Sequence, residues 1–342
     1  MKTTLKTILA ALMGALTSWA QCALGAQLTP QDVHIDGPLS NIAVEAFRDG
    51  DFVGPALFPV VPVGKQSDGY YILNKGDWMR NPTSTLRAPK TPPRRVEFSV
   101  STDTYFARNY ALAGENSFET LANADNPVAL RQRTVRKVVS DLMRDMEVRI
   151  ANQVTSVSNV GSGVILAGGN RWSQYQTSDP ISDVDSAHAF IHDTTGVIAN
   201  TLLLDYNTHK IVRRHPVLLD MYKYTRGGFL DDAEIGKCFG VGRILIGNAI
   251  RNTAAEGQTA TMANIWGNNA LLCYVDPTAP SLQTVTFGLA YRWQSPDLPA
   301  PMVARVYNDP DPGKKVELTE IGYYEDEKVV ARDLAYLINT TL

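Results

Sequence analysis

The clearest periodic pattern in the chain is an apolar stripe between residues 125 and 155. Asp125 or Asn126 can cap the first turn of a helix there, and Pro127 takes a first-turn position that tolerates proline. The outer faces of the predicted helix carry charged residues, Glu147 among them. At 1.5 Å per residue it would be about 40–45 Å long, enough to span a domain. The apolar side chains recur every three or four residues, at Val128, Val135, Val138, Val139, Leu142, Met146, Ile150 and Val154.

A second pattern, over residues 64–110, predicts a long two-stranded excursion. Tyr70–Leu73 is rich in β-forming residues, and Val96–Tyr105 alternates apolar or aromatic with polar residues, which is the period of a strand. The segment between these runs is polar, basic and interrupted by prolines. Because such a segment buries too little apolar surface to fold alone, we expect a long arm that a partner orders.

Shorter runs predict a mixture of helices and strands. Residues 27–62 contain five prolines and are expected to be extended and rich in loops. Within them, the apolar strip Ala56–Val63 suits a strand laid along another surface better than a central strand. Helices are expected over 183–196 and over 207–222, with an interruption near Pro216; strands are expected at 201–205, 244–247, 265–276, 284–293, 303–307 and 315–324, and a strand or short helix at 329–338. The fold class is therefore α+β, and the 303–307 and 315–324 strands should form an antiparallel pair.

Composition narrows the class of protein. The 342 residues are 44% hydrophobic, so a core can form without disulfide bonds. The net charge of -3 gives no global sign of a nucleic-acid binder, although one local face can still contact DNA. Cys22, Cys238 and Cys273 are far apart and lack CxxC spacing, so we expect reduced thiols and neither a disulfide framework nor a zinc site.

The first 26 residues leave two interpretations open. Met1–Lys6 carries two lysines, Ile8–Ala20 is almost entirely apolar, and Ser18–Ala20 offers small residues to a signal peptidase. The same segment could instead form an amphipathic arm that packs against a neighbouring copy. The apolar run is too short for a good transmembrane helix, and no membrane partner is expected.

The candidate chemical motifs favour structural roles. Gly240–Gly242 is followed by β-forming residues, whereas a dinucleotide-binding loop needs a helix there. His188 and His192 lie four apart on a predicted helix but have no obvious third metal ligand. Asp309 and Asp311 fit a turn. We therefore predict no catalytic residue, no cofactor and no metal ligand, and we expect that the chain is not an enzyme.

The basic arm is the main candidate for contacts between protein chains. We expect it to bind acidic patches on adjacent subunits; the alternative is a solvated loop. Direct DNA binding by the arm is disfavoured because Trp78 alone is available there for stacking on bases. Aromatic residues at the end of the second strand add candidate interface anchors. The candidate contact residues are Lys75, Trp78, Arg80, Arg87, Arg94, Arg95, Tyr105 and Phe106.

The order of these features resembles the major capsid proteins of tailed bacteriophages, which have the Hong Kong 97-type fold. The resemblance extends over roughly residues 40–342, and it rests on the order of several short stretches, none of them specific alone. They are Ala56-Leu57-Phe58-Pro59-Val60, Asp125-Asn126-Pro127, Trp172-Ser173, Ser178-Asp179-Pro180-Ile181, Asn200-Thr201-Leu202-Leu203-Leu204, His215-Pro216, Cys238-Phe239-Gly240-Val241, Ile265-Trp266-Gly267 and Phe287-Gly288.

This resemblance implies a layout for the chain. It comprises an N-terminal arm (1–63, of which 1–26 is signal-like or an arm helix), an extended β-hairpin loop (64–110), a peripheral domain (111–194) with the spine helix (125–155), an axial domain (195–295) and a return to the peripheral domain (296–342). The signal-like first 26 residues depart from the common pattern of the family.

The resemblance also implies a function. The chain is expected to self-assemble, as hexamers and pentamers, into the icosahedral head shell of a virion that forms in the host cytoplasm. Expected partners are scaffold, portal and decoration proteins, and packaged double-stranded DNA on the inner face. Two alternatives stay open: the shell of an encapsulin-like bacterial nanocompartment, and a secreted or surface binding protein, which Met1–Ala20 would favour.

Overall fold

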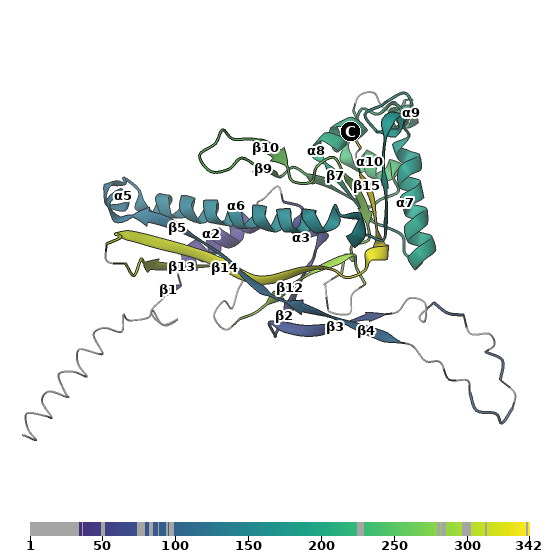
Figure 1. Cartoon of the computed structure of the whole chain (residues 1–342), viewed down its shortest axis with the longest axis horizontal. Helices are drawn as coiled ribbons and strands as arrows, with labels where there is room; N and C mark the ends of the chain where they lie inside the picture. Colours follow the sequence, from purple (N-terminus) through teal and green to yellow (C-terminus); the bar gives the residue numbers. More distant parts are fainter. Residues whose placement is uncertain are drawn as a thin grey trace, which may run out of the picture.

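In the computed structural model, the described residues form two main sheets with helices on their faces, and two two-stranded ribbons (Figure 1). The mixture of helices and strands expected from the sequence is confirmed. The structure describes residues 34–35, 37–48, 52–73, 79–81, 85–87, 89–93, 95, 99–223, 229–278, 281, 285–295, 302–311, 313–339 and 341–342.

The larger sheet is built around one long strand, β14 (Val316–Val329). Its six strands run in the order β1 (His34–Ile35), β13 (Val303–Asn308), β14, β12 (Gly288–Trp293) and β2 (Val60–Val63), and β5 (Arg108–Ser117) also pairs with β14. The antiparallel pair expected near the end of the chain is confirmed as β13 and β14. β2 lies at the end of this order, as expected for a strand whose Pro62 has no N–H to donate.

Residues 37–57 contain two helices, so the expectation of an extended segment over 27–62 is wrong there. α2 (Gly37–Arg48) packs against the long helix α6 (Pro127–Val154), and α3 (Gly54–Leu57) is a single turn. Pro38 and Pro55 lie in the first turns of these helices, where a missing N–H breaks no intrahelical hydrogen bond. The prolines therefore mark helix starts, and this part of the expected N-terminal arm packs on its own subunit.

The long helix predicted for residues 125–155 is confirmed as α6, which lies across one face of the larger sheet (Figure 1). Asn126 caps it, because its side-chain oxygen accepts a hydrogen bond from the Ala129 N–H at 3.1 Å. The predicted apolar stripe is buried from Val135 to Val154. Val128, in the first turn, is exposed, so the buried part of the stripe begins about two turns into the helix.

Glu147 is completely buried, although its charge led to its prediction on an outer face of the helix. Its Oε1 accepts hydrogen bonds from the Val53 N–H at 3.1 Å and from Trp266 Nε1–H at 2.6 Å, and its Oε2 accepts one from the Gly54 N–H at 2.7 Å. A Cβ at Gly54 would lie 2.7 Å from Oε2, so only glycine fits there. Burial raises the pKa of Glu147 above its ordinary value, and the three donors offset part of that effect.

Glutamates of β14 are also buried. In the middle of the strand, Thr319, Ile321 and Tyr323 are buried in alternation, as expected for one covered face. The glutamates toward the ends of this row are each held by an arginine through hydrogen bonds of 2.6–2.7 Å, in the pairs Arg131–Glu317, Arg149–Glu327 and Arg292–Glu325. Two of these arginines belong to α6, so the helix is tied to the sheet by charge as well as by apolar packing.

The smaller sheet has five strands and is covered by four helices (Figure 1). Its β7 is buried on both faces: Leu203 packs in the core shared with α6, whereas Leu202 and Leu204 pack against the helices. The strand order is β6 (Ser162–Ile165), β15 (Ala335–Asn339), β11 (Ala270–Cys273), β7 (Thr201–Asp205) and β8 (Arg243–Gly247); the helices are α7 (Pro180–Thr195), α8 (Tyr206–Val212), α9 (Pro216–Tyr222) and α10 (Asp232–Cys238). Short elements complete the body: α5 (Phe118–Asn123) and the 3-10 turns Val157–Asn159, Gly168–Asn170 and Arg332–Leu334.

The two sheets divide the chain differently from the expected segments. α7 packs on the smaller sheet, although it lies before the expected boundary at residue 195. β12 joins the larger sheet from within 195–295, and β15 joins the smaller sheet from within 296–342. Local periodicity identifies a strand but not the sheet that it joins, because the partner strands are distant in sequence.

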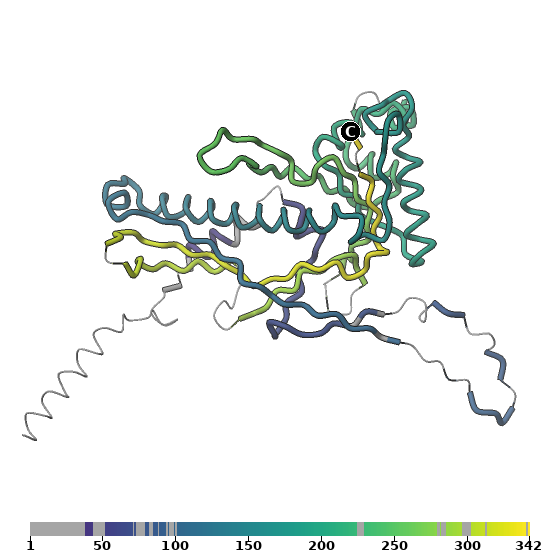
Figure 2. Tube along the Cα trace, viewed as in Figure 1, coloured from purple at the N-terminus to yellow at the C-terminus, as the bar shows by residue number. Residues whose placement is uncertain are grey.

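A two-stranded ribbon was not predicted from the sequence. It consists of β9 (Ile250–Asn252) and β10 (Met262–Asn264), and it projects on the side of α6 away from the larger sheet (Figure 2). Arg144 Nε donates to the Ile250 carbonyl oxygen at 3.2 Å and ties the ribbon to α6. The strand expected over 265–276 is confined to β11, because Trp266 points into the core at Glu147.

Two smaller expectations concern cysteines and membranes. Cys273 is buried and Cys238 half-buried, and both are free thiols as predicted, whereas Cys22 lies outside the described residues. Within the described ranges, no helix combines the length and apolar character needed to cross a bilayer.

Replacing Glu147 with alanine should strongly destabilise the subunit. The change leaves the N–H groups of Val53, Gly54 and Trp266 buried without an acceptor, which should lower the free energy of unfolding by at least about 3 kcal/mol. Urea denaturation of the unassembled subunit measures this. Asn152→Ala, at an exposed position of the same helix, is the control and should change stability by about 0.5 kcal/mol or less. Equal stability of the two variants would contradict the role of Glu147.

Candidate assembly interface

The predicted two-stranded excursion is confirmed as a hairpin of β3 (Ser67–Leu73) and β4 (Val100–Phe106). The strands are antiparallel along their whole length, from Ser67 opposite Phe106 to Leu73 opposite Val100. They lie on the opposite side of the larger sheet from α6, and they point away from the body (Figure 1). The basic arm is the segment of the chain that connects these two strands, and its described residues are 79–81, 85–87, 89–93, 95 and 99.

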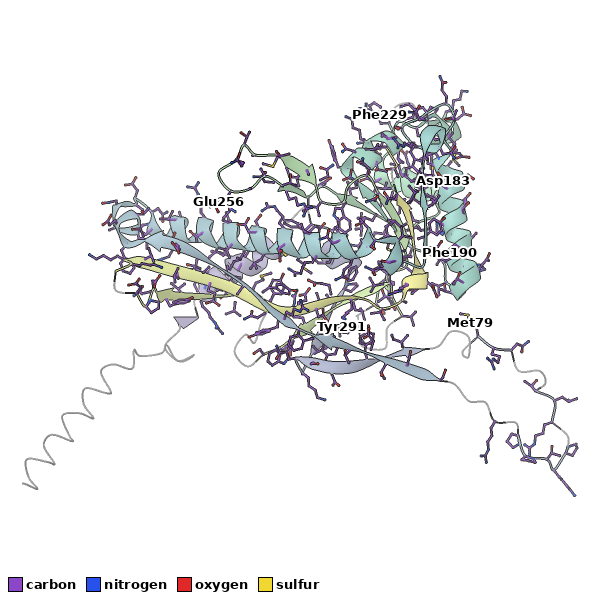
Figure 3. The ribbon with its side chains drawn as sticks, viewed as in Figure 1. Met79, Asp183, Phe190, Phe229, Glu256 and Tyr291 are labelled. Carbon is purple, nitrogen blue, oxygen red and sulfur yellow. The ribbon has the colours of Figure 1, made fainter. Side chains whose placement is uncertain are left out.

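Three tyrosines fix the base of the hairpin to the larger sheet. Tyr105 of β4 stacks on Tyr291 of β12 with ring centroids 4.7 Å apart, and Tyr70 of β3 lies 5.3 Å from the same ring. Val61 and Leu289 close the cluster. Figure 3 shows Tyr291 at this junction. Because the rings are buried together, the direction in which the arm leaves the body is set within the subunit.

Hydrogen bonds reinforce the same junction. The Tyr70 hydroxyl donates to Asp103 Oδ2 at 2.8 Å. Burial and this hydrogen bond raise the pKa of Tyr70, and the same hydrogen bond lowers the pKa of Asp103. The Phe106 N–H donates to Asp326 Oδ2 at 2.9 Å. Ala107 alone separates β4 from β5, so the hairpin is a direct continuation of a strand that runs along β14.

The predicted contact residues divide into three groups. Arg80, Arg87 and Arg95 are exposed on the arm. Phe106 is 52% exposed, but Tyr105 is only 3% exposed and packs inside its own subunit, so it is not available as an anchor for a neighbour. The reason is the strand period: adjacent residues face opposite sides, and the sequence does not tell which side is covered. Lys75, Trp78 and Arg94 lie outside the described residues.

Exposed apolar side chains accompany the arginines on the arm. Leu86 is 93% exposed, and Met79 is exposed where the arm passes the end of α7, close to Gly196 (Figure 3). An isolated exposed apolar residue is ordinary. Together with three exposed arginines on a segment that projects from the body, these residues give the arm the mixed apolar and charged character of an interface.

Sequence reasoning missed the residues that hold the arm in place. Tyr291, Asp103 and Asp326 belong to strands far apart in the chain, and none stands in a motif. The only local signal was alternation in β4, which identified a strand face but not its partner. These residues hold the base of the hairpin in place.

One pair of side chains has the appearance of a catalytic dyad, but its hydrogen bonds argue against that role. Ser178 Oγ lies 3.0 Å from His215 Nε2, and both residues are buried. His215 Nδ1 accepts from the Val217 N–H, so a neutral ring carries its proton on Nε2 and donates it to Ser178. Ser178 in turn donates to the Gln174 carbonyl at 2.8 Å. The serine proton therefore points away from the histidine, and the pair caps α9.

Other candidate motifs also have structural roles. His188 Nε2 hydrogen-bonds the Phe239 carbonyl oxygen at 2.9 Å. The N–H groups of Asp311 and Gly313 donate to the carboxylates of Asp309 and Asp311, which form the predicted turn. No cluster of three or more histidine, cysteine or acidic side chains suited to a metal ion occurs in the described part of the chain.

Comparison with known proteins shows which proteins this chain is similar to. The sequence is 26% identical over 313 residues to the major capsid protein of Pseudomonas phage JBD67, covering 90% of this chain and 97% of the relative. It is 23% identical over 248 residues to the major capsid protein of Burkholderia phage BcepMu, covering 70% and 76% of the two chains. The chain is a relative of phage major capsid proteins. No protein-family profile matches the sequence.

Solved structures show that this capsid relative has the Hong Kong 97-type fold implied by the sequence. A phage-related protein from Bordetella bronchiseptica superimposes with a TM-score of 0.71 at 24% identity, covering 90% of this chain and 98% of that chain. The capsid of cyanophage P-SCSP1u gives 0.52 at 12% identity, with 83% and 86% covered. A virus-like particle from Pyrococcus furiosus gives 0.53 at 9% identity, with 88% and 98% covered.

Replacing Tyr105 with alanine should loosen the base of the hairpin. The change removes a buried aromatic ring stacked on Tyr291, so the free energy of unfolding should fall by about 3 kcal/mol. Phe106→Ala is the neighbouring control and should change stability by about 0.5 kcal/mol or less, because that ring is half exposed. Chemical denaturation of both variants tests this. A larger loss for Phe106→Ala would show that the assignment of the two faces is wrong.

His215 should make the subunit less stable in mild acid. Burial lowers its folded-state pKa below the ordinary 6.5, so the unfolded chain binds more protons and stability falls as pH drops below about 6.5. The difference in unfolding free energy between the wild type and His215→Gln should therefore shrink from pH 7.5 to pH 5, roughly the range over which histidine titrates. Urea denaturation across this range gives the result. His192→Gln, at an exposed histidine, serves as the control; identical slopes for the wild type and His215→Gln would rule out His215 as the cause.

Proposed function

We propose that the chain is the major subunit of an icosahedral phage head shell. The observation that carries this proposal is the near end-to-end match to a phage major capsid protein, 90% of this chain against 97% of the relative, in a chain with a capsid fold. The projecting arm supports it, because an arm with exposed arginines and apolar side chains has no use in an isolated subunit. We assign the larger-sheet unit to the peripheral domain and the smaller-sheet unit to the axial domain of the family layout.

The arm is the assembly device in this proposal. It leaves the body in a direction set by Tyr70, Tyr105 and Tyr291, and it lies over the adjacent subunit of a ring. Each subunit gives an arm to one neighbour and receives one from another, which is a head-to-tail contact that closes into hexamers and pentamers. Main-chain hydrogen bonds along the arm and its arginines would supply the affinity.

The remaining partners follow from the same proposal. The shell would form in the host cytoplasm, with scaffold, portal and decoration proteins as further partners, and would enclose double-stranded DNA within the virion. We propose no enzymatic activity, since the Ser178–His215 pair is oriented for capping. The virus-like particle shares the fold at 9% identity, whereas both sequence relatives are phage proteins, which favours the phage shell over a nanocompartment.

Deleting residues 75–95 should abolish shells and leave the subunit folded. Leu73 and Val100 are opposite each other at the end of the hairpin, so residues 74 and 96–99 can close it, and the tyrosine cluster is untouched. Negative-stain electron microscopy of the expressed chain reports shells, and circular dichroism with thermal melting reports folding.

Two results would contradict the proposed role of the arm in assembly. Normal shells from the deleted chain would show that the arm is dispensable for assembly. Loss of the folded subunit would show that the arm is part of the body. Phe106→Ala tests the role of the arm independently, without a deletion. This variant should have the melting temperature of the wild type but form fewer shells, because the exposed Phe106 ring lies at the base of the arm.

A further inference from the structure

The first half of helix α6 carries a one-sided charge pattern. Residues 127–140 contain four basic residues and no acidic one, whereas residues 141–154 contain both signs. Arg131 is used inside the subunit, where it binds Glu317. The other three, Arg133, Arg136 and Lys137, are exposed.

These side chains form a ridge along the outer side of the helix. Arg133, Lys137 and Arg144 are four and seven residues apart, which places them in one line opposite the buried stripe. Arg136 lies beside this line. At 1.5 Å per residue, the line from Arg133 to Arg144 is about 16 Å long. We call Arg133, Arg136, Lys137 and Arg144 the basic ridge.

The charges at the start of the basic ridge do not help the helix to form. Arg133 is three and four residues from two other positive charges, spacings at which like charges repel. A pattern that breaks the local rules without a structural gain points to a role in binding.

Little within the described residues neutralises the ridge. Asp141 binds both Lys137 and Arg144, and it is the one carboxylate that pairs with ridge residues there. Arg133 and Arg136 have no ion-pair partner in the described ranges. Exposed acids lie on α6 itself, at Asp145, on α5 and the turn after it, at Glu119 and Asp125, and at the ribbon tip, at Glu256 (Figure 3).

We propose that the basic ridge is the surface on which the shell contacts the phosphate backbone of packaged double-stranded DNA. This inference rests on the proposed function. A duplex carries about one negative charge per 1.7 Å of its axis, so the neighbouring cations Arg133, Arg136 and Lys137, exposed on a rigid helix, can meet several phosphates at once. Contacts to phosphate carry no sequence information, which suits a container for any genome. The helix that carries the ridge lies on one side of the larger sheet, whereas the arm leaves on the sheet's other side (Figure 1).

The test compares two charge-matched variants of the full-length, unassembled subunit. One is Arg133→Gln, Arg136→Gln, Lys137→Gln on the ridge, and the other is Arg80→Gln, Arg87→Gln, Arg95→Gln on the arm. Fluorescence anisotropy with a labelled DNA duplex gives Kd over a series of salt concentrations. The ridge variant should reduce the slope of log Kd against log salt by about 2–3, since each phosphate contact contributes about 0.9, and the arm variant should keep the wild-type slope.

Several outcomes would overturn the proposal. They are no salt-dependent DNA binding by the wild type, an unchanged slope for the ridge variant, or a loss confined to the arm variant. A ridge variant that binds DNA normally but forms no shells would identify the ridge as a contact for an acidic protein surface instead.

Electron microscopy of the same proteins separates this proposal from the shell function. Normal shells from the ridge variant, with weakened DNA binding, are the expected result. Normal shells without ridge-dependent DNA binding would overturn the ridge alone. A wild type that binds DNA through the ridge but never assembles would count against the shell function.

The orientation of the ridge has a test of its own. A bulky maleimide–polyethylene glycol should label Lys137→Cys in dissociated subunits and not in intact shells, with the wild type as background for the native cysteines. Equal labelling of both forms would place the ridge outside the shell and overturn the contact with packaged DNA.

Discussion

The rest of the structure depends on the buried carboxylate of Glu147. It joins three parts of the chain that are distant in sequence: the middle of the long helix, the first turn of α3 and the loop that holds Trp266. Taking a charge out of water is costly unless its hydrogen bonds are replaced, and here two backbone N–H groups and an indole N–H replace them. Since Trp266 lies just before β11 of the smaller sheet, the same carboxylate also fixes how the two sheets sit against each other.

The larger sheet connects the core around Glu147 to the base of the arm. β14 is tied to α6 by Arg131 and Arg149, and β5 runs beside it before continuing through Ala107 into the hairpin. The tyrosine cluster then sets the direction of the hairpin. A long arm on a flexible joint would lose much conformational entropy on binding a neighbour, whereas an arm on a buried aromatic junction has already lost part of it. In the proposed assembly, the junction would therefore lower the entropy cost of binding a neighbour.

The two sides of the larger sheet have different chemistry. One side carries the hairpin, whose exposed residues mix arginines with apolar side chains such as Leu86. The other side carries α6, whose first half exposes Arg133, Arg136 and Lys137, with Val128 as its exposed large apolar residue. A protein surface needs apolar area to bind another protein tightly, and it needs positive charge at regular spacing to bind a nucleic acid backbone. A shell has an outside, an inside and lateral contacts, and the subunit has distinct surfaces for at least two of them.

The sequence by itself determined the elements whose signals are local. The stripe of α6 with its Asn126 cap, the alternation in β4 and the broken helix at Pro216 were all predicted correctly, because periodicity and capping depend on neighbours within a few residues. The exposure of the arginines on the arm was also predicted from a local signal, the polar and proline-rich composition of that segment. Only the tertiary structure decided that Glu147 is buried and that Tyr105 faces its own subunit while Phe106 faces out. It also decided that β12 joins the larger sheet and that β15 joins the smaller one. Each of these depends on partners distant in the chain, and a one-dimensional pattern shows that a face will be covered without showing what covers it.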